Sequence, residues 1–152
     1  MRSIYLVGSN HTYQFGRRPF CDVSDKALAE YHGLIMETIT RYGIATIAEE
    51  MNDHCLKKHR VHGNSVAFDI AAKLRLAHRY CEADPSVKEA RQISTKTQRE
   101  RYWIEQLKIL DAFPTLFLLG SEHVGSFANL LKESGFQPTV LADDWKHSSS
   151  ND

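Results

Sequence analysis

The sequence predicts an α/β fold: one domain over residues 1–145, with a mostly parallel five-stranded sheet and helices on both faces, then a disordered polar tail over 146–152. Two observations lead to this prediction. Short apolar stretches alternate along the chain with segments of helical apolar spacing, an order typical of a parallel sheet covered by helices. The chain has 152 residues, which suits one domain with a buried core.

Five apolar stretches predict strands, and four segments between them predict helices. The strands are expected at 3–7, 44–48, 78–82, 115–119 and 139–141, and the helices at about 24–42, 65–76, 98–113 and 124–134. Ser24 or Asp25 can cap the first helix, and Gly43 can end it. The stretch 10–23 is expected to be a loop, 51–64 a mobile histidine-rich loop with room for a helical turn, and 86–97 has no clear apolar period.

One short phrase occurs twice, each time directly after a predicted strand. Gly8-Ser9-Asn10-His11 follows the first strand, and Gly120-Ser121-Glu122-His123 follows the fourth. In the commonest doubly wound order the first strand lies beside the fourth, and ligands bind where the winding direction reverses. With the second strand flanking the first, Glu49 and Glu50 would reach the same edge. We therefore expect both histidines and this glutamate pair to form one site.

Two imidazoles and one carboxylate are the ligands of many catalytic metal sites. His11, Glu49 and His123 would hold zinc or manganese, with an open position for a water whose pKa the metal lowers. Glu50 is the alternative carboxylate, so His11, Glu49, Glu50 and His123 are the catalytic candidates. Two other interpretations stay open. One is a metal-free hydrolase with His11 or His123 as the base, and the other is a pair of ordinary strand-to-helix turns in which the histidines hydrogen-bond to the backbone.

Four further residues are candidates for binding a substrate: Ser9, Arg79, Arg99 and Ser121. Arg79 and Glu82 near the third strand can reach the cleft or form an ordinary ion pair. Arg99 and its neighbour Glu100 are predicted to lie on the charged face of a helix. Neither serine has the glycine spacing of a nucleophile elbow, and Ser121 fits better as a helix cap.

These motifs resemble the TraB/Tiki and EreA/ChaN-like superfamily: Gly-x-x-His after the first strand, the Glu49-Glu50 pair, and a late Gly-x-x-His-Val with Phe-x-x-Leu-Leu-x-x-x-Gly over 120–135. The resemblance implies a compact α/β fold with histidines and glutamates at one sheet edge. Its members include metal-dependent proteases, esterases with a histidine base and haem-binding lipoproteins. The resemblance implies that the site consists of His11, Glu49, Glu50 and His123. Arg79 or Arg99 stands where the family would have an arginine. The chain departs from the family in being very short, with no inserted helical substrate domain and no membrane segment.

Composition limits the possible partners. Nineteen Lys and Arg residues balance nineteen Asp and Glu residues, so no overall charge attracts nucleic acid or an anionic membrane. Three cysteines without metal-site spacing are typical of reduced thiols in a cytoplasmic protein. We expect a small soluble hydrolase, dependent on a divalent metal, that acts on a small molecule or peptide and can form a homo-oligomer. The alternative is a non-catalytic module that binds haem or a phosphorylated metabolite.

Overall fold

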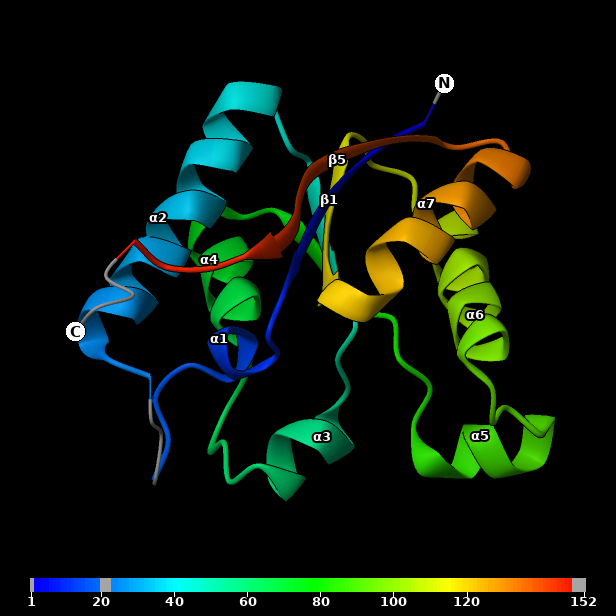
Figure 1. The fold of residues 1–152 in the computed structure, drawn as a ribbon, viewed down its shortest axis with the longest axis horizontal. Helices are drawn as coiled ribbons and strands as arrows, with labels where there is room; N and C mark the ends of the chain where they lie inside the picture. The colour runs from blue at the N-terminus through cyan, green and yellow to red at the C-terminus, as the bar shows by residue number, and fades with distance from the viewer. Residues whose placement is uncertain (1, 20–22, 149–152) are drawn as a thin grey trace.

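A single parallel sheet organises the computed structural model, which describes residues 2–19 and 23–148. Its five strands lie in the order β3-β2-β4-β1-β5. Figure 1 shows the sheet nearly edge-on, with β1 and β5 labelled. The strands are β1 (Ser3–Ser9), β2 (Thr46–Glu49), β3 (Ala77–Tyr80), β4 (Thr115–Gly120) and β5 (Gln137–Trp145). The predicted α/β fold with a five-stranded parallel sheet is therefore confirmed.

Helices cover both faces of this sheet and enclose two apolar cores (Figure 1). The helices are α1 (Thr12–Phe15), α2 (Asp25–Tyr42), α3 (Asp53–Lys58), α4 (Val66–Leu74), α5 (Pro85–Arg91), α6 (Lys96–Lys108) and α7 (Val124–Glu133), and a 3-10 turn, η1 (Ser121–His123), precedes α7. One core packs α2 and α4 against the sheet around Tyr31 and Ile47. The other packs α6 and α7 around Trp103, Phe117 and Phe127.

The predicted pairing of β1 with β4 is confirmed, with Ser9 opposite Gly120. The predicted place of β2 beside β1 is wrong, because β4 lies between them and Glu49 of β2 pairs with Leu118 of β4. Every residue of β4 is buried, and the most continuously apolar strand belongs at the centre of a sheet covered on both faces. After β1 and after β2 the chain forms helices on one face of the sheet, and after β4 it forms a helix on the other face. The carboxyl end of β4 therefore lies where the winding direction of the chain reverses.

Three short helices lie where the sequence predicted loops or showed no pattern. The side chain of Asn52 caps α3 by accepting a hydrogen bond from the Cys55 amide, and Asp84 caps α5 in the same way. Leu56 and Val61 are buried with Phe15 in a small third core. The histidine-rich stretch 51–64 is therefore packed onto the protein rather than being an open loop. Helices this short are stabilised by their caps and by single contacts. Their sequences therefore show no repeating apolar spacing from which a helix could be predicted.

Several element boundaries differ from their predicted positions. A capping box at Thr95 and Gln98 starts α6, and this helix ends at Lys108, five residues before the expected 113. Strand β5 is longer than the predicted 139–141 because it pairs with β1 over its whole length, with irregular register. In the predicted tail, Ser148 hydrogen-bonds Glu30 of α2, and residues 149–152 lie outside the described part of the chain.

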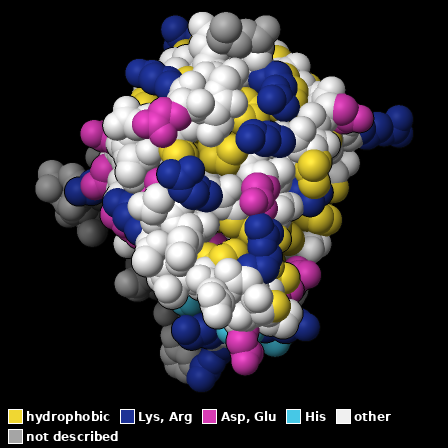
Figure 2. Space-filling view, turned by 90° about the vertical axis from the view of Figure 1, so that its right-hand side faces the viewer, with side chains coloured by type: hydrophobic (Ala, Val, Ile, Leu, Met, Phe, Trp, Pro, Cys, Tyr) yellow, Lys and Arg dark blue, Asp and Glu magenta, His cyan; other side chains and the backbone are white. Residues whose placement is uncertain are grey.

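The surface over α6 and α7 carries charges of both signs. Figure 2 shows basic, acidic and apolar side chains interspersed on this face. This mixture agrees with the equal numbers of basic and acidic residues in the chain. Among the helices of residues 2–19 and 23–148, none has the length and apolar character needed to cross a membrane.

Candidate functional site

Glu50 lies at the centre of the groups that the two Gly-Ser-x-His turns bring together. Its Oε1 is 3.4 Å from Nε2 of His11, and its Oε2 is 3.5 Å from Nε2 of His123. The Gly120 amide donates a hydrogen bond to Oε1 over 2.8 Å, and the Arg99 guanidinium donates one to Oε2 over 2.6 Å. The prediction that both histidines meet at one sheet edge is therefore confirmed, and of the two glutamates only Glu50 lies between them.

His11 and Glu50 form an ion pair across the neutral pH range. Burial alone lowers the pKa of His11, but the hydrogen bond to Glu50 and the charge of Glu50 outweigh it and raise the pKa from 6.5 to about 9. Burial alone raises the pKa of Glu50, yet the opposing hydrogen bond and charge of His11, with the Gly120 amide, lower it below 4.5. Opposite charges a few ångströms apart in a poorly hydrated place shift pKa values in these directions.

His123 is buried behind Glu50 and has a carboxylate of its own. Its Nδ1 lies 2.8 Å from Oε2 of Glu100, which also accepts a hydrogen bond from Ser126 over 2.8 Å. The Trp103 ring packs against the imidazole in a T-shaped contact at a centroid distance of 4.8 Å. Glu100 is only 2% exposed, so its predicted place on a solvated helix face is wrong. A lone acidic residue in a polar helical segment gives no sequence signal of burial.

A small cavity of about 160 Å³ opens beside His11 and Glu50. Its polar wall consists of His11, Glu50, Glu82 and Arg99, and the rest is formed by Phe15, Met51, Cys55 and His59. Arg99 binds Glu82 as well as Glu50, and Trp103 donates its indole N–H to Glu82 over 3.3 Å. Arg99 and Glu82, both expected near the cleft, are thus brought to it.

Glu49 points away from this cavity. Its side chain accepts hydrogen bonds from Ser65 over 2.5 Å and from Gln14 over 3.2 Å, and its Oε2 lies 2.6 Å from Nε2 of His78. Successive residues of a strand face opposite sides of a sheet, so Glu49 and Glu50 separate. The predicted metal trio of His11, Glu49 and His123 is therefore not assembled. In residues 2–19 and 23–148, no three His, Cys, Asp or Glu side chains form a group suited to a metal ion.

The other predicted substrate-binding residues lie in two places. The Arg79 guanidinium donates to the Gln106 side chain of α6 over 2.6 and 3.1 Å, away from the cavity beside Glu50. Ser9 and Ser121 line a larger outer cleft of about 600 Å³. Ser121 does not act as the expected helix cap: α7 begins after η1, and neither element has a side-chain cap.

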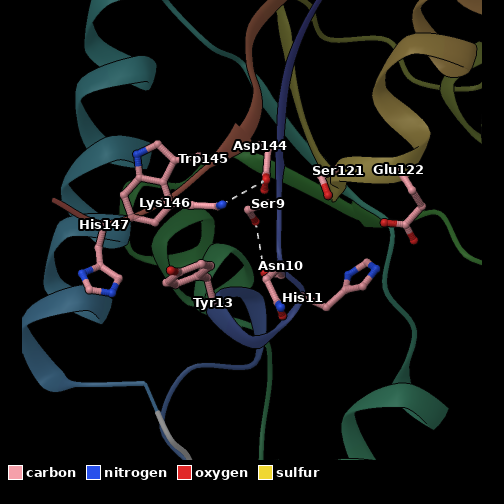
Figure 3. A pocket seen from close by; sticks show the side chains of 10 residues that line it. All are labelled: Ser9, Asn10, His11, Tyr13, Ser121, Glu122, Asp144, Trp145, Lys146 and His147. Atoms are coloured by element: carbon pink, nitrogen blue, oxygen red, sulfur yellow. Dashed lines mark hydrogen bonds and ion pairs between the residues drawn. The ribbon is translucent and has the colours of Figure 1, made fainter. Parts of the chain in front are cut away.

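His11 stands between the outer cleft and the inner cavity, and it lines both. Figure 3 shows His11 and Glu122 on one side of the outer cleft, with Trp145 and His147 on the other. Asn10, Tyr13, Asp144 and Lys146 complete the lining of this cleft. The His11 side chain is 34% exposed, whereas that of His123 is 2% exposed. His11 is therefore the histidine that a ligand in either space can reach.

Gly120 leaves room for the His11 ring to approach the backbone. A Cβ atom at this position would lie 2.9 Å from Nε2 of His11 and 3.0 Å from a carboxylate oxygen of Glu122. We expect Gly120→Ala to push the ring away from Glu50 and to lower the pKa of His11, as followed by NMR titration. Gly125→Ala is the matched control, because a Cβ there meets nothing within 4 Å. An unchanged pKa of His11 in Gly120→Ala would contradict this account of the motif.

Comparison with protein-family models, with curated proteins and with solved structures found no match to this chain. The resemblance to the TraB/Tiki and EreA/ChaN-like superfamily stays a prediction based on its three short motifs.

Proposed function

We propose that the protein is a hydrolase in which His11 and Glu50 act together as acid and base, without a metal. The observation that carries this proposal is the His11–Glu50 pair at the junction of an inner cavity and an outer cleft. Environments that drive the pKa values of two neighbouring groups apart assign acid and base roles to them. Perturbed pKa values in a cleft are also typical of functional sites.

The raised pKa of His11 makes this residue the proton donor. Since the pKa is about 9, the imidazolium is the main form at neutral pH and can protonate a leaving group or a developing oxyanion. Glu50, with its lowered pKa, stays ionised and accepts the proton of the attacking water. His123, oriented by Glu100, lies against the other oxygen of Glu50 and helps to keep this carboxylate in place.

Arg99 is the reason for preferring a mechanism without a metal. Its guanidinium lies 2.6 Å from Oε2 of Glu50, so one cation already neutralises the carboxylate that both histidines face. A divalent ion at the same carboxylate would meet strong repulsion from this fixed positive charge. Zinc or manganese would require Arg99 to move away from Glu50, and a chelator therefore tests the two mechanisms.

A substrate screen with matched histidine variants tests the proposal. Untagged protein is assayed against ester, peptide and phosphodiester substrates, with and without a chelator. We expect turnover that survives the chelator and falls about 10²- to 10⁴-fold in His11→Ala, the range for loss of a general acid. His32→Ala, an exposed histidine of α2, should keep full activity. The rate should also fall as the pH rises through about 9, where His11 loses its proton.

Three results would contradict the proposal. Loss of activity with chelator and recovery with zinc or manganese would favour the metal-dependent hydrolase. Full activity in His11→Ala would remove His11 from the chemistry. Binding of haem or of a phosphorylated metabolite without turnover of any substrate would favour the binding module, which would use the outer cleft of about 600 Å³.

A further inference from the structure

A buried amide connects Glu49 to His11. Gln14 of α1 is 1% exposed, and its side chain lies between the two residues. Its Oε1 is 2.8 Å from Nδ1 of His11, and its Nε2 is 3.2 Å from Oε1 of Glu49. Both glutamates of the Glu49-Glu50 pair therefore act on the same imidazole. Glu50 faces Nε2 directly, and Glu49 reaches Nδ1 through Gln14.

Only one orientation of this amide satisfies both of its neighbours. A carboxylate can only accept hydrogen bonds, so the NH₂ group of Gln14 must face Glu49. The amide oxygen is then left for His11, and an oxygen can only accept, so Nδ1 of His11 donates to it. In the neutral ring this oxygen at 2.8 Å and Oε1 of Glu50 at 3.4 Å compete for one proton, and the shorter contact favours Nδ1. Reversing the amide would place its oxygen against the Glu49 carboxylate, at the cost of a buried, unpaired acceptor.

Glu49 is itself held so that it keeps this orientation. Its other oxygen accepts the hydroxyl proton of Ser65, because the Ser65 oxygen is occupied in accepting the Phe68 amide hydrogen at the start of α4. Nε2 of His78 lies 2.6 Å from the same oxygen. Glu49 is fully buried, and a buried carboxylate oxygen requires a hydrogen-bond donor. The Gln14 NH₂ group is the donor to Oε1 of Glu49.

We infer that Gln14, held by Glu49, is a positioning residue that keeps a proton on Nδ1 of His11, so that His11 exchanges protons through Nε2 alone. Nε2 is the ring nitrogen that faces Glu50. The Gly120 backbone and Glu122 of η1 also lie near the ring. The catalytic part of this inference rests on the proposed hydrolase function, whereas the tautomer of His11 does not.

NMR of isotopically labelled histidine tests the tautomer in the intact protein. Ring-nitrogen chemical shifts are recorded above the pKa of about 9, where His11 is neutral, and its signals are assigned by their absence in His11→Ala. We expect the Nδ1–H form in the wild-type protein. The Nε2–H form in the wild-type protein would overturn the inference, whether or not the protein is a hydrolase.

Two substitutions of Gln14 separate positioning from packing. Gln14→Leu keeps the bulk but removes the acceptor, so a substantial share of His11 should change to the Nε2–H form. Gln14→Asn keeps an amide on a side chain shorter by one methylene group, so it should keep a larger share of the Nδ1–H form than Gln14→Leu does. Gln106→Leu is the control, because it removes an amide that contacts Arg79 instead, and it should leave the tautomer unchanged. An unchanged Nδ1–H form in Gln14→Leu would overturn the inference.

Activity provides a separate readout for the same variants. With a substrate from the screen, Gln14→Leu should lower kcat at least about tenfold, as is usual for residues that orient a reacting imidazole. KM should change little, because Gln14 is buried and contacts His11 rather than the cleft. Unchanged kcat together with a changed tautomer would remove Gln14 from the reaction and overturn the catalytic part.

Discussion

Replacement of Glu50 by glutamine is expected to lower the pKa of His11 from about 9 toward or below its ordinary value of 6.5. Glutamine has nearly the same shape but no charge, so the attraction that outweighs the burial of His11 disappears and burial remains. NMR titration of His11 measures this change directly. The proposed hydrolase should also lose most of its activity, because the substituted residue cannot accept a proton from water.

The same substitution should destabilise the protein most strongly at mildly acidic pH. Removing one member of a buried charge network costs about 3–5 kcal/mol, and we expect the lower end because Arg99 and His11 are partly exposed. The pKa of His11 is raised on folding, so its contribution is complete below pH 6.5 and is lost as the pH rises through about 9. The pKa of Glu50 is lowered, so its contribution is present above pH 4.5 and is lost as the pH falls through its folded pKa.

Denaturant unfolding of the wild-type protein and of Glu50→Gln across this pH range tests the stability prediction. The difference in free energy of unfolding should be largest between about pH 4.5 and 6.5 and should shrink as the pH rises from 6.5 through about 9. Glu133→Gln, at an exposed position of α7, should show little difference at any pH. A pKa of His11 that stays near 9 in Glu50→Gln would show that another group holds its proton.

Glu100→Ala is expected to lower the free energy of unfolding by about 3 kcal/mol, because it leaves buried polar groups without a partner. Nδ1 of His123 and the hydroxyl of Ser126 both lose the carboxylate that they contact at 2.8 Å. Glu105→Ala on the same helix is the matched control. Its carboxylate is 51% exposed and pairs with Arg91, so the loss should stay below about 1 kcal/mol, as for surface ion pairs.

Chemical denaturation of both variants, followed by fluorescence, provides the comparison. Trp103 packs against His123, so its emission should also change in Glu100→Ala before unfolding begins. Equal stability of the two alanine variants would mean that Glu100 does not stabilise His123. The proposed support of Glu50 by His123 would then lose its basis.

Regular apolar spacing and the repeated Gly-Ser-x-His phrase explain why so much of this fold can be predicted from the sequence. Long apolar stretches such as 115–119 bury both of their faces, and α2 has helical spacing, a capping serine and a terminal glycine. The repeated Gly-Ser-x-His phrase marks two strand ends that prove to be neighbours. Each of these signals lies within a short stretch of sequence, and the residues of that stretch determine which side of the element is buried. The position of β2 was mispredicted because strand order depends on which strand is buried deepest, a property of the whole sheet.

The choice between Glu49 and Glu50 shows where local reasoning ends. Adjacent residues at a strand end face opposite sides, so the sequence predicts that one glutamate reaches the cleft but not which one. The partners decide: Gln14, Ser65 and His78 surround Glu49, whereas Arg99 and the Gly120 amide hold Glu50. Most of these partners are distant in the chain from the glutamates. No spacing rule connects them.

The sequence by itself determined the fold class, the neighbouring strands β1 and β4, and the meeting of His11 and His123 beside a glutamate. Only the tertiary structure decided the chemical character of the site. It buries Glu100 behind His123 and places Gln14 between Glu49 and His11. The physical reason is that apolar periods report which surface of an element is buried, whereas the charge and proton positions of a buried group depend on partners supplied by other elements.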